Sequence, residues 1–254
     1  MSATLRRLHR IPRALLHVAA GLVVIAFAFP SLDAAARRSR IRRWSQRLLG
    51  LLHVELRVTG SLVQRNVVVA SNHISWIDIL ALNAIGPVRF IAKSEIARWP
   101  VLGRLVAGAG TLFIERARRR DTHRVNRDVA AALQGGDIVA VFPEGTTSDG
   151  TAVLPFHGSL LQPAIDAGGS VLPVAIRYMT PAGARSTAVD YVGDVTLVAS
   201  FWRVCGAQAI VADIVTCAPL AATGVRRRRL AADVEAAIRA ALASPASGSA
   251  PGIK

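Results

Sequence analysis

Short apolar segments separated by glycine, proline and charged residues recur through residues 54–215, and this pattern constrains the fold more than any other feature of the sequence. Short runs rich in valine and isoleucine are typical of buried strands, and longer runs with helical spacing of apolar residues are typical of helices. The two kinds alternate here, which predicts a layered α/β fold with a mostly parallel sheet flanked by helices. The segments that predict strands are 54–58, 67–71, 89–92, 111–114, 138–142, 171–178 and 209–215. The segments that predict helices are 77–85, 99–108, 121–133, 158–167, 195–204 and 225–242.

A chain of 254 residues is long enough for one sizeable α/β domain, which we place at residues 51–242. Residues 243–254 consist mostly of serine, alanine, proline and glycine, and we expect them to be a disordered tail. Pro173 lies inside the 171–178 segment. Because proline cannot donate a hydrogen bond to a neighbouring strand, it predicts that this strand is an edge strand or carries a bulge.

The N-terminal region predicts two helices with an affinity for membranes. Residues 14–29 are apolar except for His17, but 16 residues are fewer than the ~20 that a spanning helix needs. Residues 33–52 form a basic amphipathic pattern that is typical of an anionic membrane surface. Arginines flank the apolar segment on both sides, which favours both ends on the cytoplasmic face.

We therefore predict that residues 1–50 are a two-helix anchor that dips into one leaflet, on the cytoplasmic face of the inner (cytoplasmic) membrane. One short spanning helix and a soluble helical hairpin packed on the core are the alternatives. A signal peptide also begins with basic and then apolar residues. Against it, no clean cleavage site precedes the next basic block at Arg37 and Arg38.

Composition narrows the class of partner. The chain is 52% hydrophobic and carries a net charge of +15, which suggests an anionic partner. Aromatic residues are only 5%, and no helix-turn-helix, zinc-finger or RNA-recognition pattern occurs, which argues against nucleic acid. Cys205 and Cys217 are too few for a disulfide framework, and no Cys/His pair has metal-ligand spacing. We expect neither a metal nor a bound cofactor.

Residues 72–78 place a histidine and a carboxylate where a predicted strand ends and a predicted helix begins. Loops at the ends of such strands are where α/β folds carry their chemistry. A histidine can take a proton near pH 7, and a carboxylate can orient it. Ser75 followed three residues later by Asp78 also fits a helix capping box, so the segment alone leaves both interpretations open.

Four segments make the chemistry more specific. They are 72–78 (Asn-His-Ile-Ser-Trp-Ile-Asp), 110–116 (Gly-Thr-Leu-Phe-Ile-Glu-Arg), 142–148 (Phe-Pro-Glu-Gly-Thr-Thr-Ser) and 171–176 (Val-Leu-Pro-Val-Ala-Ile). In this order they resemble the four blocks of the glycerolipid acyltransferase family, which includes 1-acyl-sn-glycerol-3-phosphate acyltransferases and other lysophospholipid acyltransferases. Those blocks are Asn-His-x4-Asp, Gly-x-x-Phe-x-x-Arg, Phe-Pro-Glu-Gly-x-x-Ser/Thr and an apolar block around a proline. The first and third together are specific, and the set covers nearly half of the chain.

The resemblance and the chemistry together make His73 the predicted general base and Asp78 its orienting carboxylate. Five helical residues correspond to roughly 140° of rotation, so the two would not share a helix face. We therefore expect His73 just before the helix and Asp78 in its first turn, reaching back to the imidazole. The hydroxyl of the substrate would take the place of the serine of a triad, and no acyl-enzyme is implied.

The same resemblance implies a set of substrate-binding residues. Arg116 would be a ligand of the acceptor phosphate, because a guanidinium can donate two parallel hydrogen bonds. Gly145 and Thr146 lie in a turn whose backbone N–H groups can face an anion, and Glu144 would bond a hydroxyl or orient Arg116. Lys93 would assist the acceptor or the acyl donor, although a surface lysine fits equally well.

The implied activity is transfer of a fatty acyl group from an acyl thioester to the free hydroxyl of a lysolipid, giving phosphatidate when the acceptor is 1-acylglycerol-3-phosphate. The thioester would be acyl-CoA or acyl-acyl carrier protein, and the basic helices would attract anionic membrane lipid and an acidic carrier. His157 stands where many relatives have lysine or arginine, which leaves a lyso-aminolipid acceptor such as lyso-ornithine lipid open. A non-catalytic basic membrane-binding protein is the alternative of another class.

Overall fold

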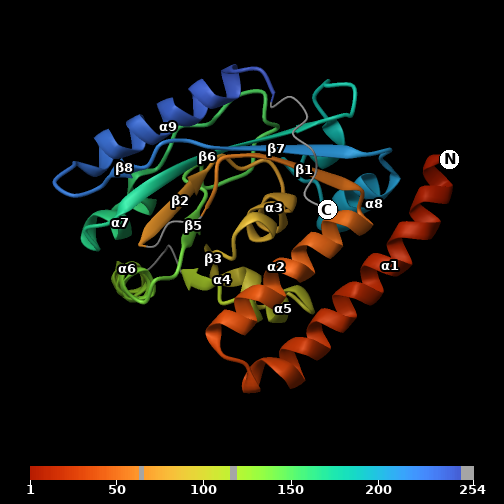
Figure 1. Ribbon diagram of the computed structural model, residues 1–254, viewed down its shortest axis with the longest axis horizontal. Coiled ribbons are helices and arrows are strands. Elements are labelled where there is room, and N and C mark those ends of the chain that lie inside the picture. Colours follow the sequence, from red (N-terminus) through yellow and green to blue (C-terminus); the bar gives the residue numbers. More distant parts are fainter. Residues whose placement is uncertain (63–65, 115–118, 247–254) are drawn as a thin grey trace.

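A computed structural model describes residues 1–62, 66–114 and 119–246. In this part of the chain eight strands form one sheet, in the order β1-β7-β6-β2-β5-β3-β4, with β8 paired to β6 (Figure 1). The strands are β1 (Val54–Thr59), β2 (Val67–Ser71), β3 (Arg89–Lys93), β4 (Leu112–Ile114), β5 (Val139–Val141), β6 (Ser170–Met179), β7 (Ile210–Thr216) and β8 (Leu220–Ala221). The helices of the domain are α3 (Ile77–Ile85), α4 (Ser94–Ala97), α5 (Leu102–Gly108), α6 (Arg119–Gln134), α7 (Gln162–Asp166), α8 (Leu197–Gly206) and α9 (Arg227–Ala243).

The sheet is mostly parallel, as the alternation of segments predicts. The five strands β6, β2, β5, β3 and β4 run parallel to one another. The pair β1 and β7 is parallel within itself and antiparallel to β6. The carboxyl ends of β2, β5, β3 and β4 therefore lie at one edge of the sheet, which is where open α/β sheets place ligands.

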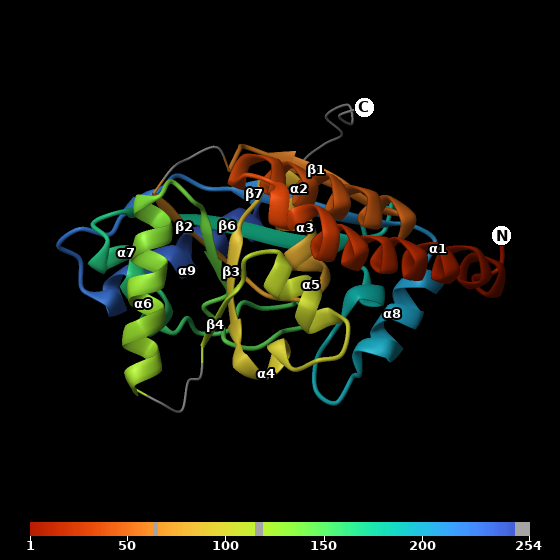
Figure 2. The ribbon, with the colours of Figure 1, turned by 90° about the horizontal axis from the view of Figure 1, so that it is seen from below.

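Both faces of the sheet are covered by helices. Along β2, Val67 and Val69 belong to one core cluster, whereas Val68 and Ala70 belong to the other, because successive side chains point to opposite faces. The first cluster packs the sheet against α1, α2, α3 and α8, and the second packs it against α6, α7 and α9. Figures 1 and 2 show α9 and α3 on opposite sides of the sheet. This burial on both faces explains why the parallel strands have almost continuous apolar sequences.

Two helices precede the sheet. α1 (Ala3–Val23) continues through a π-helical turn (Val24–Ala28) and a 3-10 turn (Phe29–Ser31), and α2 (Ala34–Leu51) follows. The helical stretch Ala3–Ser31 is 29 residues long, and by length and composition it could cross a membrane. α1 therefore begins well before the apolar segment 14–29. The predicted pair of N-terminal helices is present, and its membrane role stays a prediction.

The basic start of α1 is bonded to the α/β domain. The Arg10 guanidinium is buried and donates to the carbonyl oxygens of Ala207 (2.7 Å) and Gln208 (2.8 Å), just after α8 ends. Arg6 Nε donates to the Gly206 oxygen at 2.8 Å. The last carbonyls of a helix lack partners within the helix, so these arginines cap α8 from outside. Two of the N-terminal arginines are therefore bonded within the protein and do not face solvent with all of their donors free.

Two local predictions need correction. Of the two alternatives for the 171–178 strand, the edge strand is wrong, because β6 lies between β2 on one side and β7 with β8 on the other. The bulge fits the register, because residues 172–173 of β6 lie opposite the three residues 217–219 between β7 and β8. The Pro173 carbonyl accepts from Cys217 N at 2.9 Å, so the missing N–H of Pro173 faces the point where the chain leaves β7. The helix predicted at 158–167 is divided into a 3-10 turn (Gly158–Leu160) and α7, which has a proline in its first turn.

Candidate active site

The loop that follows β2 is attached to the neighbouring strand β6. The Asn72 side-chain amide donates to the Ile176 carbonyl oxygen at 2.9 Å, and its oxygen accepts from Ile176 N at 2.8 Å. The amide thereby continues the pairing of the two strands for one residue beyond the end of β2. This reciprocal pair fixes the main chain immediately before His73.

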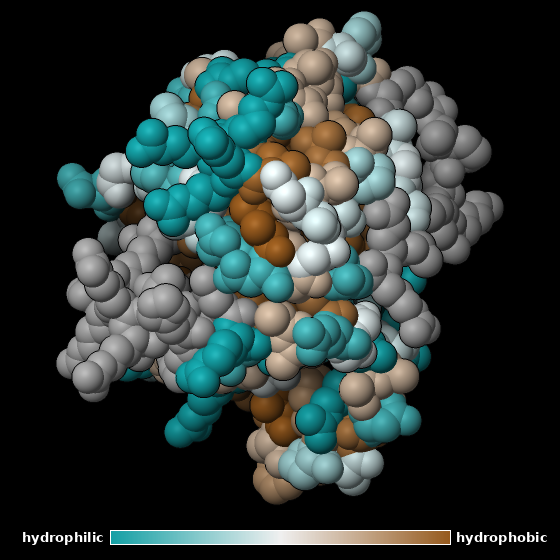
Figure 3. Space-filling view, turned by 90° about the vertical axis from the view of Figure 1, so that its left-hand side faces the viewer, coloured by the Kyte–Doolittle hydropathy of each residue, from teal (hydrophilic) through white to brown (hydrophobic). Residues whose placement is uncertain are grey.

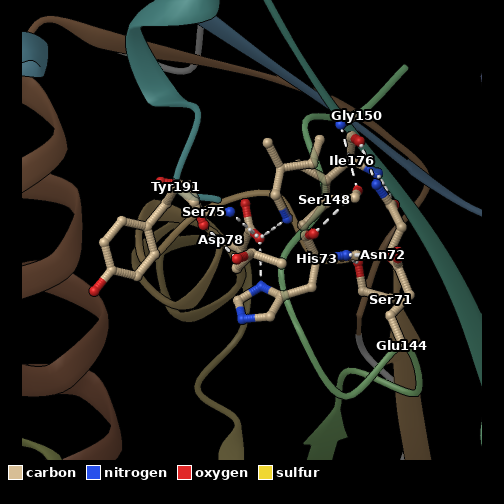
Figure 4. Close-up of polar contacts among 12 residues, drawn as sticks. Ser71, Asn72, His73, Ser75, Asp78, Glu144, Ser148, Gly150, Ile176 and Tyr191 are labelled. Carbon is tan, nitrogen blue, oxygen red and sulfur yellow. Dashed lines mark hydrogen bonds and ion pairs between the residues drawn. The ribbon is translucent and has the colours of Figure 1, made fainter. Parts of the chain in front are cut away.

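Asp78 lies in the first turn of α3 and is fully buried. Its Oδ2 atom accepts hydrogen bonds from His73 Nδ1 (2.7 Å), Ile74 N (2.7 Å) and Ser75 N (2.9 Å), as Figure 4 shows. Two backbone N–H donors and the positive end of the α3 dipole face the carboxylate. A carboxylate only accepts, so Nδ1 of His73 carries the hydrogen and Nε2 of the neutral imidazole carries the lone pair.

The capping box takes a modified form. Asp78 accepts from Ser75 N, as a box carboxylate does, but α3 begins after Trp76 and has no side-chain cap. The Ser75 hydroxyl is buried, and no hydrogen-bond partner for it lies in the described part of the chain. The carboxylate therefore serves the helix start and the imidazole together, and the two interpretations of the segment are compatible.

The imidazole of His73 is held from one side by an aromatic ring. It stacks on Phe142 with centroids 3.9 Å apart and an interplanar angle of 9°. The side chain keeps 18% of its exposure, and the Nε2 edge points away from Asp78 (Figure 4). Within residues 1–62, 66–114 and 119–246 no protein group bonds to Nε2. The free lone pair can therefore take a proton from a bound hydroxyl.

The loop after β5 is hydrogen-bonded to the main chain of His73. Glu144 Oε1 accepts from His73 N at 2.7 Å, and Oε2 accepts from Leu154 N at 2.9 Å. Ser148 N donates to the His73 carbonyl oxygen at 2.8 Å, so both main-chain groups of His73 are fixed by this loop. Burial raises the pKa of Glu144 above its usual value, and the two backbone N–H donors oppose that shift.

These features occur in a known family. A model of the family described as Acyltransferase matches residues 54–177. The chain is 44% identical over 181 residues to a 1-acyl-sn-glycerol-3-phosphate acyltransferase from Neisseria gonorrhoeae, covering 71% of each chain. It is 36% identical over 246 residues to a lyso-ornithine lipid O-acyltransferase from Pseudomonas aeruginosa, covering 94% of this chain and 95% of that protein. The chain belongs to the acyltransferase family.

A solved structure has the same fold as this acyltransferase. The crystal structure of the 1-acyl-sn-glycerophosphate (LPA) acyltransferase PlsC from Thermotoga maritima superposes with a TM-score of 0.70 at 22% identity. The match covers 94% of this chain and 95% of that one, so it includes the N-terminal helices as well as the sheet. The predicted fold class and the predicted enzyme class are both confirmed.

The structure describes some of the other predicted site residues of the acyltransferase and not others. Gly145 has a φ of +73°, which favours glycine, and its N–H is used within the turn by the Phe142 carbonyl oxygen at 3.0 Å. The Thr146 side chain is exposed. Lys93 ends β3, but its side chain lies outside the described residues, as does the whole of Arg116, which follows the end of β4. Their binding roles stay predictions.

Two contributors were missed by sequence reasoning. Phe142 belongs to the third block, but nothing in the sequence shows that its ring faces His73. Tyr178 lies just beyond the fourth block and donates its hydroxyl hydrogen to Asp78 Oδ1 at 2.7 Å. The sequence feature that could have identified Tyr178 is a phenol near the carboxyl end of an apolar strand. In the described part of the chain no group of three or more His, Cys, Asp and Glu side chains could hold a metal ion.

Proposed function

We propose that this acyltransferase transfers a fatty acyl group from an acyl thioester to the free hydroxyl of a lysolipid, with His73 as general base. The observation that carries the proposal is the His73 Nδ1–Asp78 Oδ2 bond of 2.7 Å, which leaves Nε2 pointing away from Asp78 (Figure 4). An alcohol is a weak nucleophile until a base removes its proton, and this base is already oriented.

The reaction balances without a protein nucleophile. The acceptor hydroxyl passes its proton to Nε2 while its oxygen attacks the thioester carbonyl carbon. The imidazolium that forms is stabilised by the Asp78 carboxylate. When the carbon–sulfur bond breaks, the imidazolium returns the proton to the thiolate, so the products are an ester and a thiol. Asp78 Oδ2 keeps its bonds to two backbone N–H groups as well as to the imidazole.

The proposed acceptor is 1-acylglycerol-3-phosphate, supported by the 44% identity to the Neisseria gonorrhoeae protein named for it. Arg116 would hold its phosphate, assisted by Lys93 and by the turn at Gly145 and Thr146, because β5, β3 and β4 end at the same edge of the sheet as β2. We propose acyl-CoA or acyl-acyl carrier protein as the donor, which requires no bound cofactor.

Lyso-ornithine lipid is the second candidate acceptor. The Pseudomonas aeruginosa relative named for this substrate matches nearly the full length of the chain. His157, at a position where a fixed cation was expected, is compatible with an acceptor that lacks a phosphate monoester. Each candidate acceptor presents a free hydroxyl to be acylated, so the proposed role of His73 is the same for both.

The test offers the purified protein an acyl thioester and a panel of lysolipids that includes both candidates, with products weighed by mass spectrometry. We expect one acceptor to gain one acyl chain. His73→Ala should lower turnover by at least about 100-fold. The variant should fold, because Asp78 keeps its bonds to Ile74 N, Ser75 N and Tyr178. Turnover retained in His73→Ala would remove the base assignment, and no product with any lysolipid would favour the non-catalytic alternative.

We also propose that α1 lies in one leaflet of the cytoplasmic membrane, on its cytoplasmic face. One side of α1 is buried and bonded to the domain through Arg10, whereas the other carries an exposed apolar stripe. The stripe consists of Leu5, Leu8, Leu15, Leu16 and Val23, and it continues to the exposed Phe27 in the π-helical turn after α1. In Figure 3 apolar atoms also gather at the lower end of the molecule, at the height of the turn between α1 and α2 in Figure 1. A helix with one docked and one apolar side fits an interfacial position better than a span.

Replacing Leu15, Leu16 and Phe27 by glutamine tests this position. Sedimentation with anionic liposomes should fall strongly while the melting temperature stays within about 2 °C, since exposed positions contribute little to folding. The control replaces three exposed alanines of α9, Ala232, Ala236 and Ala240, by glutamine. Equal sedimentation of the stripe variant and the control would contradict the proposed orientation.

A further inference from the structure

The two oxygens of the Asp78 carboxylate accept hydrogen bonds from different sets of donors. Three donors converge on Oδ2, whereas the Tyr178 hydroxyl is the donor to Oδ1, at 2.7 Å. Asp78 is fully buried, so water does not solvate Oδ1. We infer that Tyr178 is a positioning residue of the reaction, one that fixes the Asp78 carboxylate and moderates its hold on the proton of His73. The inference rests on the proposed role of His73 as general base.

The fold presents Tyr178 to Asp78 by strand alternation. Ile176 and Tyr178 are two residues apart on β6, so their side chains share one face of the sheet, the face covered by α3. The backbone of Ile176 is the group that binds Asn72, immediately before His73. One short stretch of β6 therefore fixes the catalytic loop at Asn72 and the carboxylate at Asp78.

The phenol is suited to act as a constant donor. Burial, and next the neighbouring Asp78 carboxylate, raise the pKa of Tyr178 well above its usual value of 10.0. It therefore stays protonated at every pH at which the enzyme works. Among the described side chains, the titratable groups bonded to this carboxylate are His73 and Tyr178, and Glu144 lies on the other side of the His73 main chain.

The bond to Oδ1 has a geometric and an electrostatic consequence. It prevents the carboxylate from rotating about its Cβ–Cγ bond, so Oδ2 stays in line with Nδ1 of His73. It also draws negative charge towards Oδ1, which weakens the attraction of the carboxylate for the imidazolium. A moderate attraction suits a base that must take a proton from the hydroxyl and then return it to the thiolate.

Tyr178→Phe tests the inference, since it keeps the ring and removes only the hydroxyl. With the preferred lysolipid and an acyl thioester, we expect kcat to fall about tenfold, as for loss of a hydrogen bond to a charged group. KM for the acceptor should change less than twofold. The acid limb of the profile of kcat/KM against pH should move to higher pH, because the unmoderated carboxylate retains the imidazolium proton more strongly.

Asn83→Ala is the matched structural control. Asn83 is buried on α3, the helix that carries Asp78, and its Oδ1 accepts from Val88 N at 3.1 Å, away from the site. This variant should lose stability and keep the wild-type profile against pH. A second test combines Tyr178→Phe with Asp78→Asn, which removes the charge that the phenol serves. We expect the tenfold effect of Tyr178→Phe to disappear in that background.

The outcomes separate this inference from the proposed function. If His73→Ala is inactive while Tyr178→Phe keeps the wild-type kcat and profile against pH, Tyr178 is only structural and the inference fails alone. The inference also fails if Tyr178→Phe lowers activity only in proportion to the fraction of unfolded protein. If His73→Ala keeps full turnover, the proposed base and the positioning role of Tyr178 both fail.

Discussion

Replacing Glu144 by glutamine decides whether this carboxylate holds the catalytic loop or binds the substrate. The resemblance implies contact with the substrate, whereas the structure shows both oxygens bonded to backbone N–H groups of His73 and Leu154. Only 3% of the residue is exposed. Glutamine has the same shape but only one acceptor oxygen, so one of the two N–H groups must face an amide NH2 group.

The expected cost follows from these bonds. A hydrogen bond to a charged acceptor contributes roughly 1.5–3 kcal/mol, and a buried N–H left without an acceptor costs about 1–3 kcal/mol. Relief of the buried charge, which raises the pKa of Glu144, offsets part of this loss. We expect a net loss of about 2 kcal/mol, which lowers the melting temperature of a domain of this size by roughly 4–8 °C.

The kinetic expectation is a change in kcat. If Glu144 fixes the His73 main chain, its loss displaces the imidazole, and a displacement of about 1 Å can lower the rate by about 100-fold. We expect kcat to fall 10- to 100-fold and KM for the acceptor to stay within about twofold. Thiol release from the thioester at varied acceptor concentration gives both constants, and thermal unfolding gives the stability.

Asp149→Asn is the control, because Asp149 lies on the same loop and its carboxylate accepts from the N–H and the hydroxyl of nearby Thr151, away from His73. It should change neither constant appreciably. An increase in KM at unchanged kcat and melting temperature for Glu144→Gln would refute the loop-holding role and favour the substrate contact.

Two further predictions concern pH and the N-terminal helix. Because the pKa of Glu144 is raised in the folded protein, its contribution to stability is fully present below about pH 4.5 and is lost as pH rises through the raised value. In unfolding measurements, the difference in free energy of unfolding between wild type and Glu144→Gln should therefore shrink as pH rises from 4.5. A difference that grows with pH would contradict this prediction. Arg10→Met should lower the melting temperature by roughly 4–12 °C, since two carbonyl oxygens after α8 lose a charged donor, whereas Arg40→Met on the exposed side of α2 should have almost no effect.

The architecture could be predicted because each element has a local signature. β2 is a valine-rich run, α3 is closed by Gly86, and the alternation of such segments determines the layers. The strand order could not be predicted in the same way. Nothing near residue 210 shows that β7 runs antiparallel to β6, because a buried strand has the same composition in both directions.

The positive charge of the N-terminus shows a second limit. Arg6 and Arg10 fit an electrostatic interaction with anionic lipid when they are considered in sequence alone. In the structure they donate to carbonyl oxygens at the end of α8, about 200 residues away. A capping interaction between distant helices leaves no local pattern, so net charge overstates how many arginines are free to meet a membrane.

The pair His73 and Asp78 was predictable because its spacing and its place between strand and helix determine its geometry. The residues that support the pair come from the loop after β5 and from β6, and only the folded chain shows what they contact. The fourth block illustrates this. Its proline lies where β6 changes its antiparallel partner between β8 and β7, so the missing N–H interrupts no ladder. Beyond that proline, the strand provides the backbone that binds Asn72 and the phenol that binds Asp78. The block therefore consists of apolar residues because it is a central strand, and its link to catalysis is the position that it gives to these two groups.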